Sequence, residues 1–253
     1  MNKKPSTSTI LLLIFLLAAV ALTTYLVLQR TIFQSEAGAT EEPKFITVTN
    51  EREDGFTIAW ITTKDTQGTV KLINENLTFA ESEMGKTHII EIDGLDSGSV
   101  YKFSITSGAE FDDNEGIGYE AYTTKVEPRS ENKLFFGRIF GKDSTTPLKE
   151  GFITMQSEVN GDISNKIISR LNEQGGWQMD KSALMSTDLT REFNVSKSAL
   201  VTLGIFSPEI TDPVYRTYEL TLAETLQIPD IFLGEDVPWE LPAIEDETIT
   251  AKE

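Results

Sequence analysis

The segment FTIAWI, Phe56 to Ile61, alternates between two sets of side chains along the chain. Phe56, Ile58 and Trp60 form one set, and the residues between them form the other. Successive side chains of a β-strand point to opposite faces, so this two-residue period predicts a strand with Phe56, Ile58 and Trp60 on one face. The segment therefore indicates a β-sheet protein.

Further short segments of the same kind follow this strand. They are GTVKLI from Gly68, HIIEI from His88, SVYKFSIT from Ser99 and GYEAYTT from Gly118. Gly, Asp, Asn and Ser lie between them, and no helical period is present. Short strands separated by turn residues predict an antiparallel sandwich.

Residues 43–126 resemble a fibronectin type III domain. The resemblance rests on FITVTN shortly after Pro43, on the tryptophan of FTIAW, and on LDSGSVYKFSI from Leu95 to Ile105. The last segment has the leucine, glycine, tyrosine order of that family's sixth strand.

The resemblance implies structural roles for four residues: Trp60, Leu95, Gly98 and Tyr101. Trp60 would pack between the two sheets. Tyr101 would be the tyrosine-corner residue, whose hydroxyl bonds to the backbone a few residues upstream. We interpret Trp60 and Tyr101 as packing residues rather than ligand-binding residues.

A second module is predicted over residues 133–234, after a polar linker at 127–132. Its expected strands lie within LFFGRIF, GFITMQ, NKIISRLNEQGGWQM, SALVTLGIF, TYELTLA and PDIFLG. This module resembles the carboxypeptidase regulatory-like, transthyretin-type sandwich. The positions that carry the resemblance are Gly137, Pro147, Gly151, Asn172, Gly175, Gly176 and Trp177. One stretch, MSTDLTREFNVSK, departs from that family as an insertion between strands.

The run ILLLIFLLAAVALTTYLVL, Ile10 to Leu28, carries no charge and is just long enough to span a bilayer as a helix. Basic residues precede it, so residues 1–9 are expected in the cytoplasm and the rest of the chain outside. Residues 29–42 read as a stalk. The alternative is a cleaved signal peptide ending near Ala39. The predicted fold class is all-β, with two consecutive Ig-like sandwiches after a transmembrane helix.

The composition of the chain excludes several classes of function. The net charge of -18 argues against nucleic-acid binding, which needs clustered Lys and Arg. No cysteine is present, so disulfides and thiolate sites are excluded. The single histidine, His88, rules out paired-histidine metal sites, and we expect it at a partly buried edge position. No catalytic residue and no cofactor-binding residue is predicted, and we expect a protein that is not an enzyme.

Calcium is the one cofactor worth considering. Its candidate ligands are Asp112, Asp113, Asn114 and Glu115, which lie in one loop but lack the EF-hand spacing. A solvated acidic turn is the alternative. Residues 235–253 form an acidic tail that we expect to be disordered. Its Val237, Trp239, Leu241 and Ile244 could either order against a partner or pack along the second module.

These features predict a membrane-anchored surface protein that presents two modules to proteins or glycans. One alternative is a structural subunit or spacer of an envelope assembly. Another is an accessory module of a separately encoded envelope enzyme. The sequence names no ligand.

Overall fold

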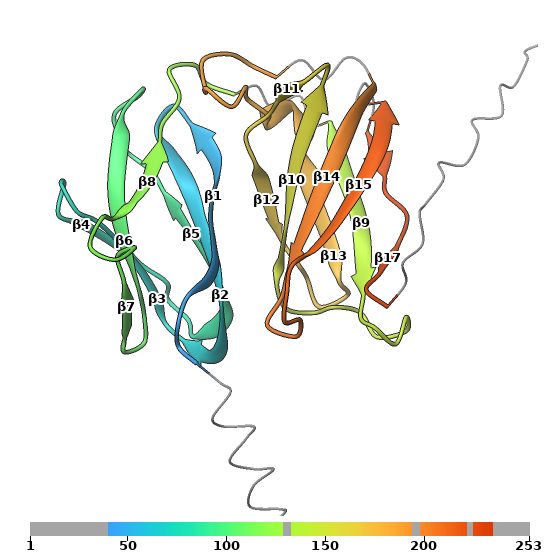
Figure 1. Ribbon diagram of the computed structural model, residues 1–253, viewed down its shortest axis with the longest axis horizontal. Helices are drawn as coiled ribbons and strands as arrows, with labels where there is room; N and C mark the ends of the chain where they lie inside the picture. The colour runs from blue at the N-terminus through green and yellow to red at the C-terminus, as the bar shows by residue number, and fades with distance from the viewer. Residues whose placement is uncertain (1–39, 129–132, 194–197, 222–224, 235–253) are drawn as a thin grey trace, which may run out of the picture.

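The computed structural model describes residues 40–128, 133–193, 198–221 and 225–234. Over these ranges the chain is built of β-strands, with one short 3₁₀ helix, η1, at Lys181–Ala183 (Figure 1). The strands form two sandwiches, so the predicted all-β sandwich fold is confirmed.

The predicted membrane helix at Ile10–Leu28, most of the stalk and the acidic tail at 235–253 lie outside the described residues. Within the described ranges, no helix has the length and apolar character that a membrane span requires.

The first sandwich is fibronectin type III-like, with a three-stranded and a five-stranded sheet. The smaller sheet has the order β1-β2-β5, with bounds Lys44–Arg52, Gly55–Thr66 and Gly85–Ile92. The larger sheet has the order β4-β3-β6-β7, and β8 also pairs with β6. Its bounds are Leu77–Ala80 for β4, Gly68–Leu72 for β3, Val100–Ser107 for β6, Glu110–Asp112 for β7 and Tyr119–Tyr122 for β8.

The core of this sandwich follows from the alternation in β2. Phe56, Ile58 and Trp60 are fully buried between the two sheets. Phe103 and Ile105 of β6 complete the cluster from the opposite sheet. The apolar face predicted for the segment is therefore the core face.

The second sandwich also has two sheets. One consists of β11, β10, β14 and β15 in that order, with β12 beside β10. Their bounds are Asp162–Ile163, Phe152–Val159, Ser198–Phe206, Val214–Thr221 and, for β12, Ile167–Arg170. The other sheet is centred on β9, Leu134–Phe140, which pairs with β13 and, in parallel, with β16 and β17. The bounds of these three are Gly176–Asp180, Leu226–Gln227 and Ile231–Phe232.

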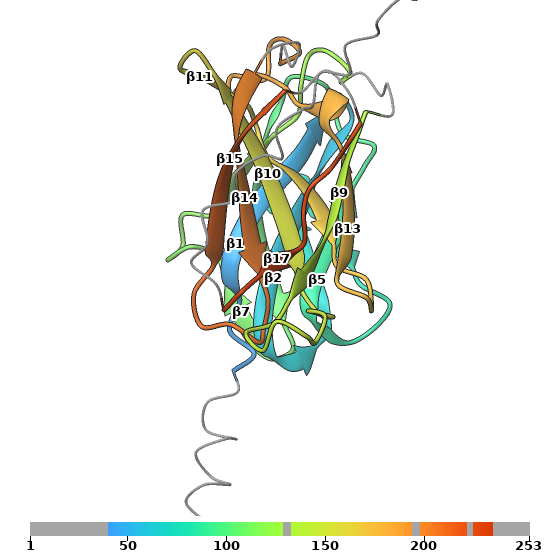
Figure 2. The same ribbon diagram turned by 90° about the vertical axis from the view of Figure 1, so that its right-hand side faces the viewer.

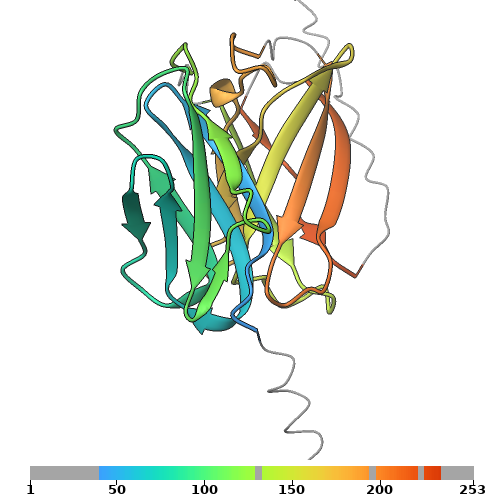
Figure 3. The same cartoon turned by 60° about the vertical axis from the view of Figure 1, so that its left-hand side comes forward.

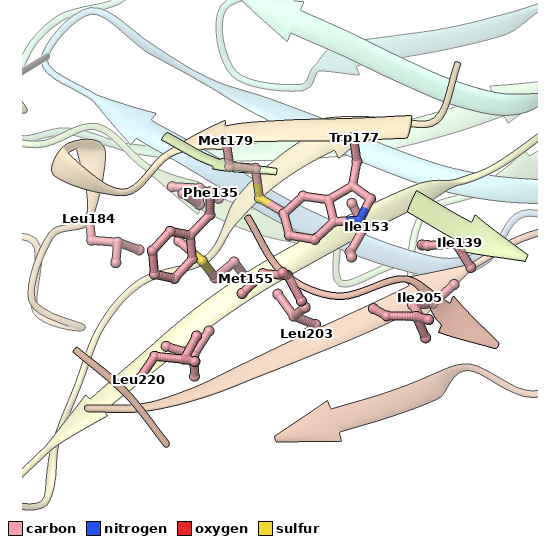
Figure 4. Packing of buried hydrophobic residues seen from close by; sticks show 14 of the residues in the cluster. Phe135, Ile139, Ile153, Met155, Trp177, Met179, Leu184, Leu203, Ile205 and Leu220 are labelled. Carbon is pink, nitrogen blue, oxygen red and sulfur yellow. The ribbon is translucent and has the colours of Figure 1, made fainter. Parts of the chain in front are cut away.

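A separate hydrophobic core lies between these sheets (Figure 4). Phe135 of β9 and Trp177 of β13 approach Met155 of β10 and Leu203 of β14 from the opposite sheet (Figure 4). Each sandwich thus has its own core, as expected of two modules.

The two sandwiches lie side by side, with β1 and β2 next to β10 and β12 (Figures 1 and 3). Seen from the far side of the second sandwich, its strands lie in front of those of the first (Figure 2). An apolar cluster joins them, in which Ala59 and Ile61 of β2 meet Phe152 and Phe206. The outer face of β2 is therefore buried as well as its core face.

Two irregularities in β1 direct side chains into this contact. The register of β1 against β2 shifts between Lys44 and Thr47 and again between Thr49 and Arg52. Phe45 and Asn50 lie at these shifts with positive φ, 57° and 49°. Bulges re-aim side chains, and the Phe45 ring lies 6.0 Å from the ring of Phe206.

Polar groups surround the apolar cluster. At one end, Asn50 N–H donates to the Lys166 carbonyl at 2.9 Å, and Asn165 Nδ2 donates to Glu51 Oε2 at 2.9 Å. At the other end, Arg170 Nη1 donates to the Thr87 carbonyl at 3.1 Å. This pattern of an apolar centre with a polar rim is typical of a specific protein interface. The sandwiches are therefore held together by more than the peptide between them.

We predict that Phe206→Ala lowers the free energy of unfolding by about 3 kcal/mol, because it opens a cavity between the sandwiches. Denaturant unfolding of the full chain measures this change. Phe111→Ala is the control, since Phe111 is exposed and outside the cluster, and it should change stability by less than about 0.5 kcal/mol. Equal effects of the two variants would contradict a stabilising interface.

A second prediction concerns Glu51. Burial raises the pKa of Glu51, and the hydrogen bond from Asn165 opposes this only in part. A carboxyl with a higher pKa in the folded state binds its proton more tightly there. Its contribution to stability is therefore full below the unfolded-state pKa and is lost as pH rises through the folded-state pKa.

Glu51→Gln should remove this loss, because glutamine stays neutral and can still accept from Asn165. The free energy of unfolding of the Glu51→Gln variant minus that of the natural chain should therefore be larger at about pH 7 than at about pH 4. Thermal or denaturant unfolding measures this difference. The control is Glu91→Gln, which changes an exposed residue of β5. Parallel pH profiles for Glu51→Gln and the natural chain would refute the prediction.

Candidate functional site

His88 lies among buried polar side chains beside the first core. Its ring stacks on that of Trp60, with centroids 4.8 Å apart. Nδ1 lies 2.6 Å from Glu81 Oε2, and since a carboxylate can only accept, Nδ1 donates. Nε2 lies 3.1 Å from the hydroxyls of both Thr62 and Thr66. The order of carboxylate, imidazole and hydroxyl is that of a catalytic triad.

Access decides against catalysis at this cluster. His88 and Thr62 have exposed fractions of 0%, so no substrate reaches the hydroxyl. Glu81 also accepts from the N–H groups of Gly68 and Ile89, which fix it in place. The cluster is a satisfied buried network.

The sequence predicts a partly buried position at a sheet edge for His88. The predicted degree of burial is wrong, because His88 is fully buried. His88 does lie on β5, an edge strand of the small sheet. The Trp60 ring and the Glu81 side chain cover it, and Arg170 of the second sandwich lies 3.9 Å from Glu81 Oε1. The neighbouring sandwich thus helps to close an edge that would otherwise meet solvent.

We predict that His88→Ala lowers the free energy of unfolding by about 3 kcal/mol, because Glu81 loses the Nδ1–H donor and Trp60 loses the ring that stacks on it. Denaturant unfolding tests this, with Glu91→Ala on the exposed side of the same strand as control. Unchanged stability of His88→Ala would show that the network is not structural.

Tyr101 organises the loop between β5 and β6. Its hydroxyl accepts from Asp96 N–H at 2.8 Å, five residues upstream. Thr123 Oγ1 donates to the Asp96 carbonyl at 2.6 Å and accepts from Ser99 N–H at 2.9 Å. Leu95 packs against the core beside them. This end of the sandwich is therefore held in one conformation.

The positions singled out in the second sandwich serve packing and turns. A side chain at Gly137 would press on the Trp177 ring at 3.2 Å, and Trp177 pairs with Gly137 across β9 and β13. Asn172 Oδ1 accepts from Gly176 N–H at 2.8 Å and so closes the turn before β13. Pro147 bridges to Phe140 at the end of β9.

The loop proposed for calcium uses its carboxylates internally. Asp112 accepts from Asn114 N–H and from the Tyr119 hydroxyl, both at 2.9 Å. Asp113 accepts from Gly116 N–H at 2.8 Å. Burial and Asp112 together raise the pKa of Tyr119 to about 12. In the part of the chain that the structure describes, no three His, Asp or Glu side chains are grouped to hold a metal ion, so calcium at Asp112–Glu115 stays a prediction.

A cleft between the two sandwiches is the candidate functional site. Its volume is about 310 Å³. The residues that line it are Gly98, Ser99, Tyr122, Thr123 and Lys125 from the first sandwich and Thr187, Asp188, Leu189 and Thr190 from the second. We call it the distal cleft, because it lies at the end of the molecule away from Thr40.

The position of the distal cleft follows from β1. Thr124 N–H donates to the Arg52 carbonyl at the end of this strand, whereas Thr40 precedes its start. A nine-residue strand spans roughly 30 Å. Thr40 and the distal cleft therefore lie at opposite ends of the first sandwich.

The wall from the second sandwich is a tight turn. Asp188 Oδ1 accepts from the Ser186 hydroxyl and from both N–H and Oγ1 of Thr190, at 3.2 and 2.9 Å for the latter two. These bonds lower the pKa of Asp188, so it is ionised at neutral pH. Thr187 Oγ1 donates to the Ile163 carbonyl at 2.6 Å. Leu189 adopts a positive φ of 56° within this turn.

Asn165 ties this wall to the sandwich interface. Its Oδ1 accepts from Met185 N–H at 2.9 Å, and its Nδ2 donates to Glu51 Oε2. The turn at 187–190 is thus positioned by the same contact that joins the sandwiches. Sequence reasoning missed the cleft, because its walls come from different modules and because 185–197 read only as an insertion.

A second hollow, of about 580 Å³, lies at the opposite end beside Thr40. Glu41, Glu42, Glu110 and Asp112 make its lining acidic. Lys64 forms an ion pair with Glu41 at 2.5 Å there. This hollow adjoins the entry of the chain from residues 1–39, so it is less suited than the distal cleft to an external ligand.

Comparison with known proteins gives no family for this chain. No family model matches the sequence, and no curated protein is similar to it. Among solved structures, the backbone protein of the group B streptococcus pilus 2b is similar at 9% identity and a TM-score of 0.26, covering 74% of this chain and 96% of that one. A two-domain fibronectin type III segment of chicken tenascin has 12% identity and a TM-score of 0.24, covering 70% and 99%. Likeness at this level carries no conclusion about function.

Proposed function

We propose that this protein is a non-catalytic surface module, anchored in the membrane by Ile10–Leu28, that binds a protein or glycan with its distal end. The observation that carries the proposal is the packing of the two sandwiches against each other through the apolar cluster of Ala59, Ile61, Phe152 and Phe206. Because the sandwiches pack together, residues of both line a cleft at the end away from Thr40.

Other features support the proposal. The first described strand, β1, begins at the same end of the molecule at which β17 finishes (Figure 1). In the described part of the chain the opposite end presents loops, and loops on a rigid scaffold are common binding sites. The triad-like cluster at His88 is closed to substrate.

The second sandwich is proposed to be of the carboxypeptidase regulatory-like, transthyretin-type class. Support comes from Gly137 beneath Trp177 and from the Asn172 turn. The alternative of a spacer is less well supported, since two sandwiches side by side reach no further than one. A role as accessory module of a separate enzyme stays a prediction.

Site-specific photo-crosslinking in intact cells tests the proposed function. A photoreactive phenylalanine analogue in place of Tyr122, at the rim of the distal cleft, should capture a protein or glycan that is not this chain. The same analogue in place of Phe111, which is exposed beside the hollow at the other end, is the matched control and should not capture that partner. Capture of lipid or of this chain alone at Tyr122 would refute the proposal, and so would equal capture at both positions.

A further inference from the structure

The distal cleft carries two charged groups whose bonding capacity is unused. Among the described residues, Lys125 Nζ has no hydrogen-bond or ion-pair partner. Asp188 uses only Oδ1 within its turn, which leaves Oδ2 free to accept. The first sandwich thus offers a donor and the second an acceptor across one cleft.

Asp188 is fixed by its turn, whereas Lys125 packs its aliphatic stem over Gly98 and leaves its ammonium group exposed. The Lys125 side chain lies over Gly98, where a β-carbon would come within 2.7 Å of its Cγ. Gly98 has a φ of 60°, which glycine adopts without strain, and its lack of a side chain leaves room for the Lys125 side chain. Asp188 is fixed by Ser186 and Thr190, as described above. Asp188 therefore needs little reordering to meet a ligand, which favours binding, and the Lys125 ammonium group is free to turn toward the same ligand.

Hydroxyl groups make up most of the remaining polar lining. They belong to Ser99, Tyr122, Thr123, Thr187 and Thr190. Each hydroxyl can both donate and accept. All five already donate within the protein, to Asp96, Ile163, Ser97, Glu120 and Asp188, so what they offer a ligand is their capacity to accept. Such a lining suits a ligand that carries several hydrogen-bond donors, as neighbouring hydroxyl groups do.

The rim adds an apolar surface. Tyr122 is 43% exposed, and it pairs across β6 and β8 with Val100, which is also exposed. An aromatic ring beside an aliphatic side chain can cover the C–H face of a ring-shaped ligand. The volume of about 310 Å³ lies at the lower end for ligand pockets, so the ligand is small.

Charge selects between neutral and ionised ligands. Among the residues that line the cleft, the charges of Lys125 and Asp188 balance each other, while the chain as a whole carries -18. An anionic ligand would approach against this field, and nothing in the balanced cleft favours a net charge. A neutral ligand with neighbouring hydroxyls matches the donor and acceptor better than an ion does.

We infer that the distal cleft binds a neutral sugar ring, with adjacent hydroxyls bound by Lys125 Nζ and Asp188 Oδ2 and with the ring lying against Tyr122. This inference rests on the proposed binding function and names the ligand class of its site. Binding of one ring would be weak, and many anchored copies would raise the total strength through avidity.

The test uses the full chain reconstituted in phosphatidylcholine vesicles and an array of immobilised neutral mono- and disaccharides, including galactose, glucose, mannose and N-acetylglucosamine. The natural chain should bind at least one of them, and the free sugar should compete at about 10 mM. Failure to bind any neutral sugar would overturn the inference. Binding confined to acidic sugars would also overturn it. So would competition by free glycine instead of sugar, because glycine carries an ammonium and a carboxylate group that could pair with Asp188 and Lys125.

Variants assign the binding to the cleft. Asp188→Asn keeps Oδ1 for the turn and removes the free carboxylate oxygen, and Lys125→Gln removes the ammonium. Each should weaken binding about tenfold or more, while Lys71→Gln on the exposed face of β3 should have no effect. Thermal unfolding must be the same for all three, which excludes misfolding as the cause.

Equal sugar binding by Asp188→Asn, Lys125→Gln and the natural chain would place the sugar elsewhere and refute the inference. The crosslinking at Tyr122 distinguishes this failure from failure of the proposed function. If Asp188→Asn still captures the partner, the distal end binds without the sugar contact, and the proposed function stands without this ligand.

Discussion

The apolar contact of Ala59 and Ile61 with Phe152 and Phe206 is the interaction on which the rest of the structure depends. It covers the outer face of β2, which would otherwise expose isoleucine to water. Burial of this surface favours association without specifying direction. The polar groups around it fix the relative orientation of the two sandwiches. Asn50 and Arg170 form hydrogen bonds to backbone groups across the contact, and these bonds can form in only one arrangement of the sandwiches.

The two bulges in β1 show how a sheet edge becomes an interface. A regular edge strand presents unpaired N–H and C=O groups that invite further pairing. In β1 the residues with positive φ, Phe45 and Asn50, turn out of the ladder instead. The ring of Phe45 then packs on Phe206, and the amide of Asn50 bonds to Ile168. Each bulge thus exchanges regular pairing for a specific contact with the second sandwich.

The same contact connects the fold to the candidate site. Asn165 bonds to Glu51 on one side and to Met185 on the other, and the turn that follows Met185 forms one wall of the distal cleft. The facing wall is set by Tyr101 and Thr123 through Asp96. The cleft is therefore rigid on both sides, although it lies between two modules that a linker alone would leave free to move.

Sequence alone determined the strands, because the two-residue period of Phe56, Ile58 and Trp60 is a local property of the chain. It also determined which residues mark turns, as Gly98 and Asn172 do through their own backbone chemistry. Tertiary structure decided the burial of His88 and the existence of the distal cleft. Both depend on residues more than sixty positions apart, such as Glu81 with Arg170 and Lys125 with Asp188. A local period carries no information about which outer faces meet, and only the packing of the two sandwiches brings these side chains together.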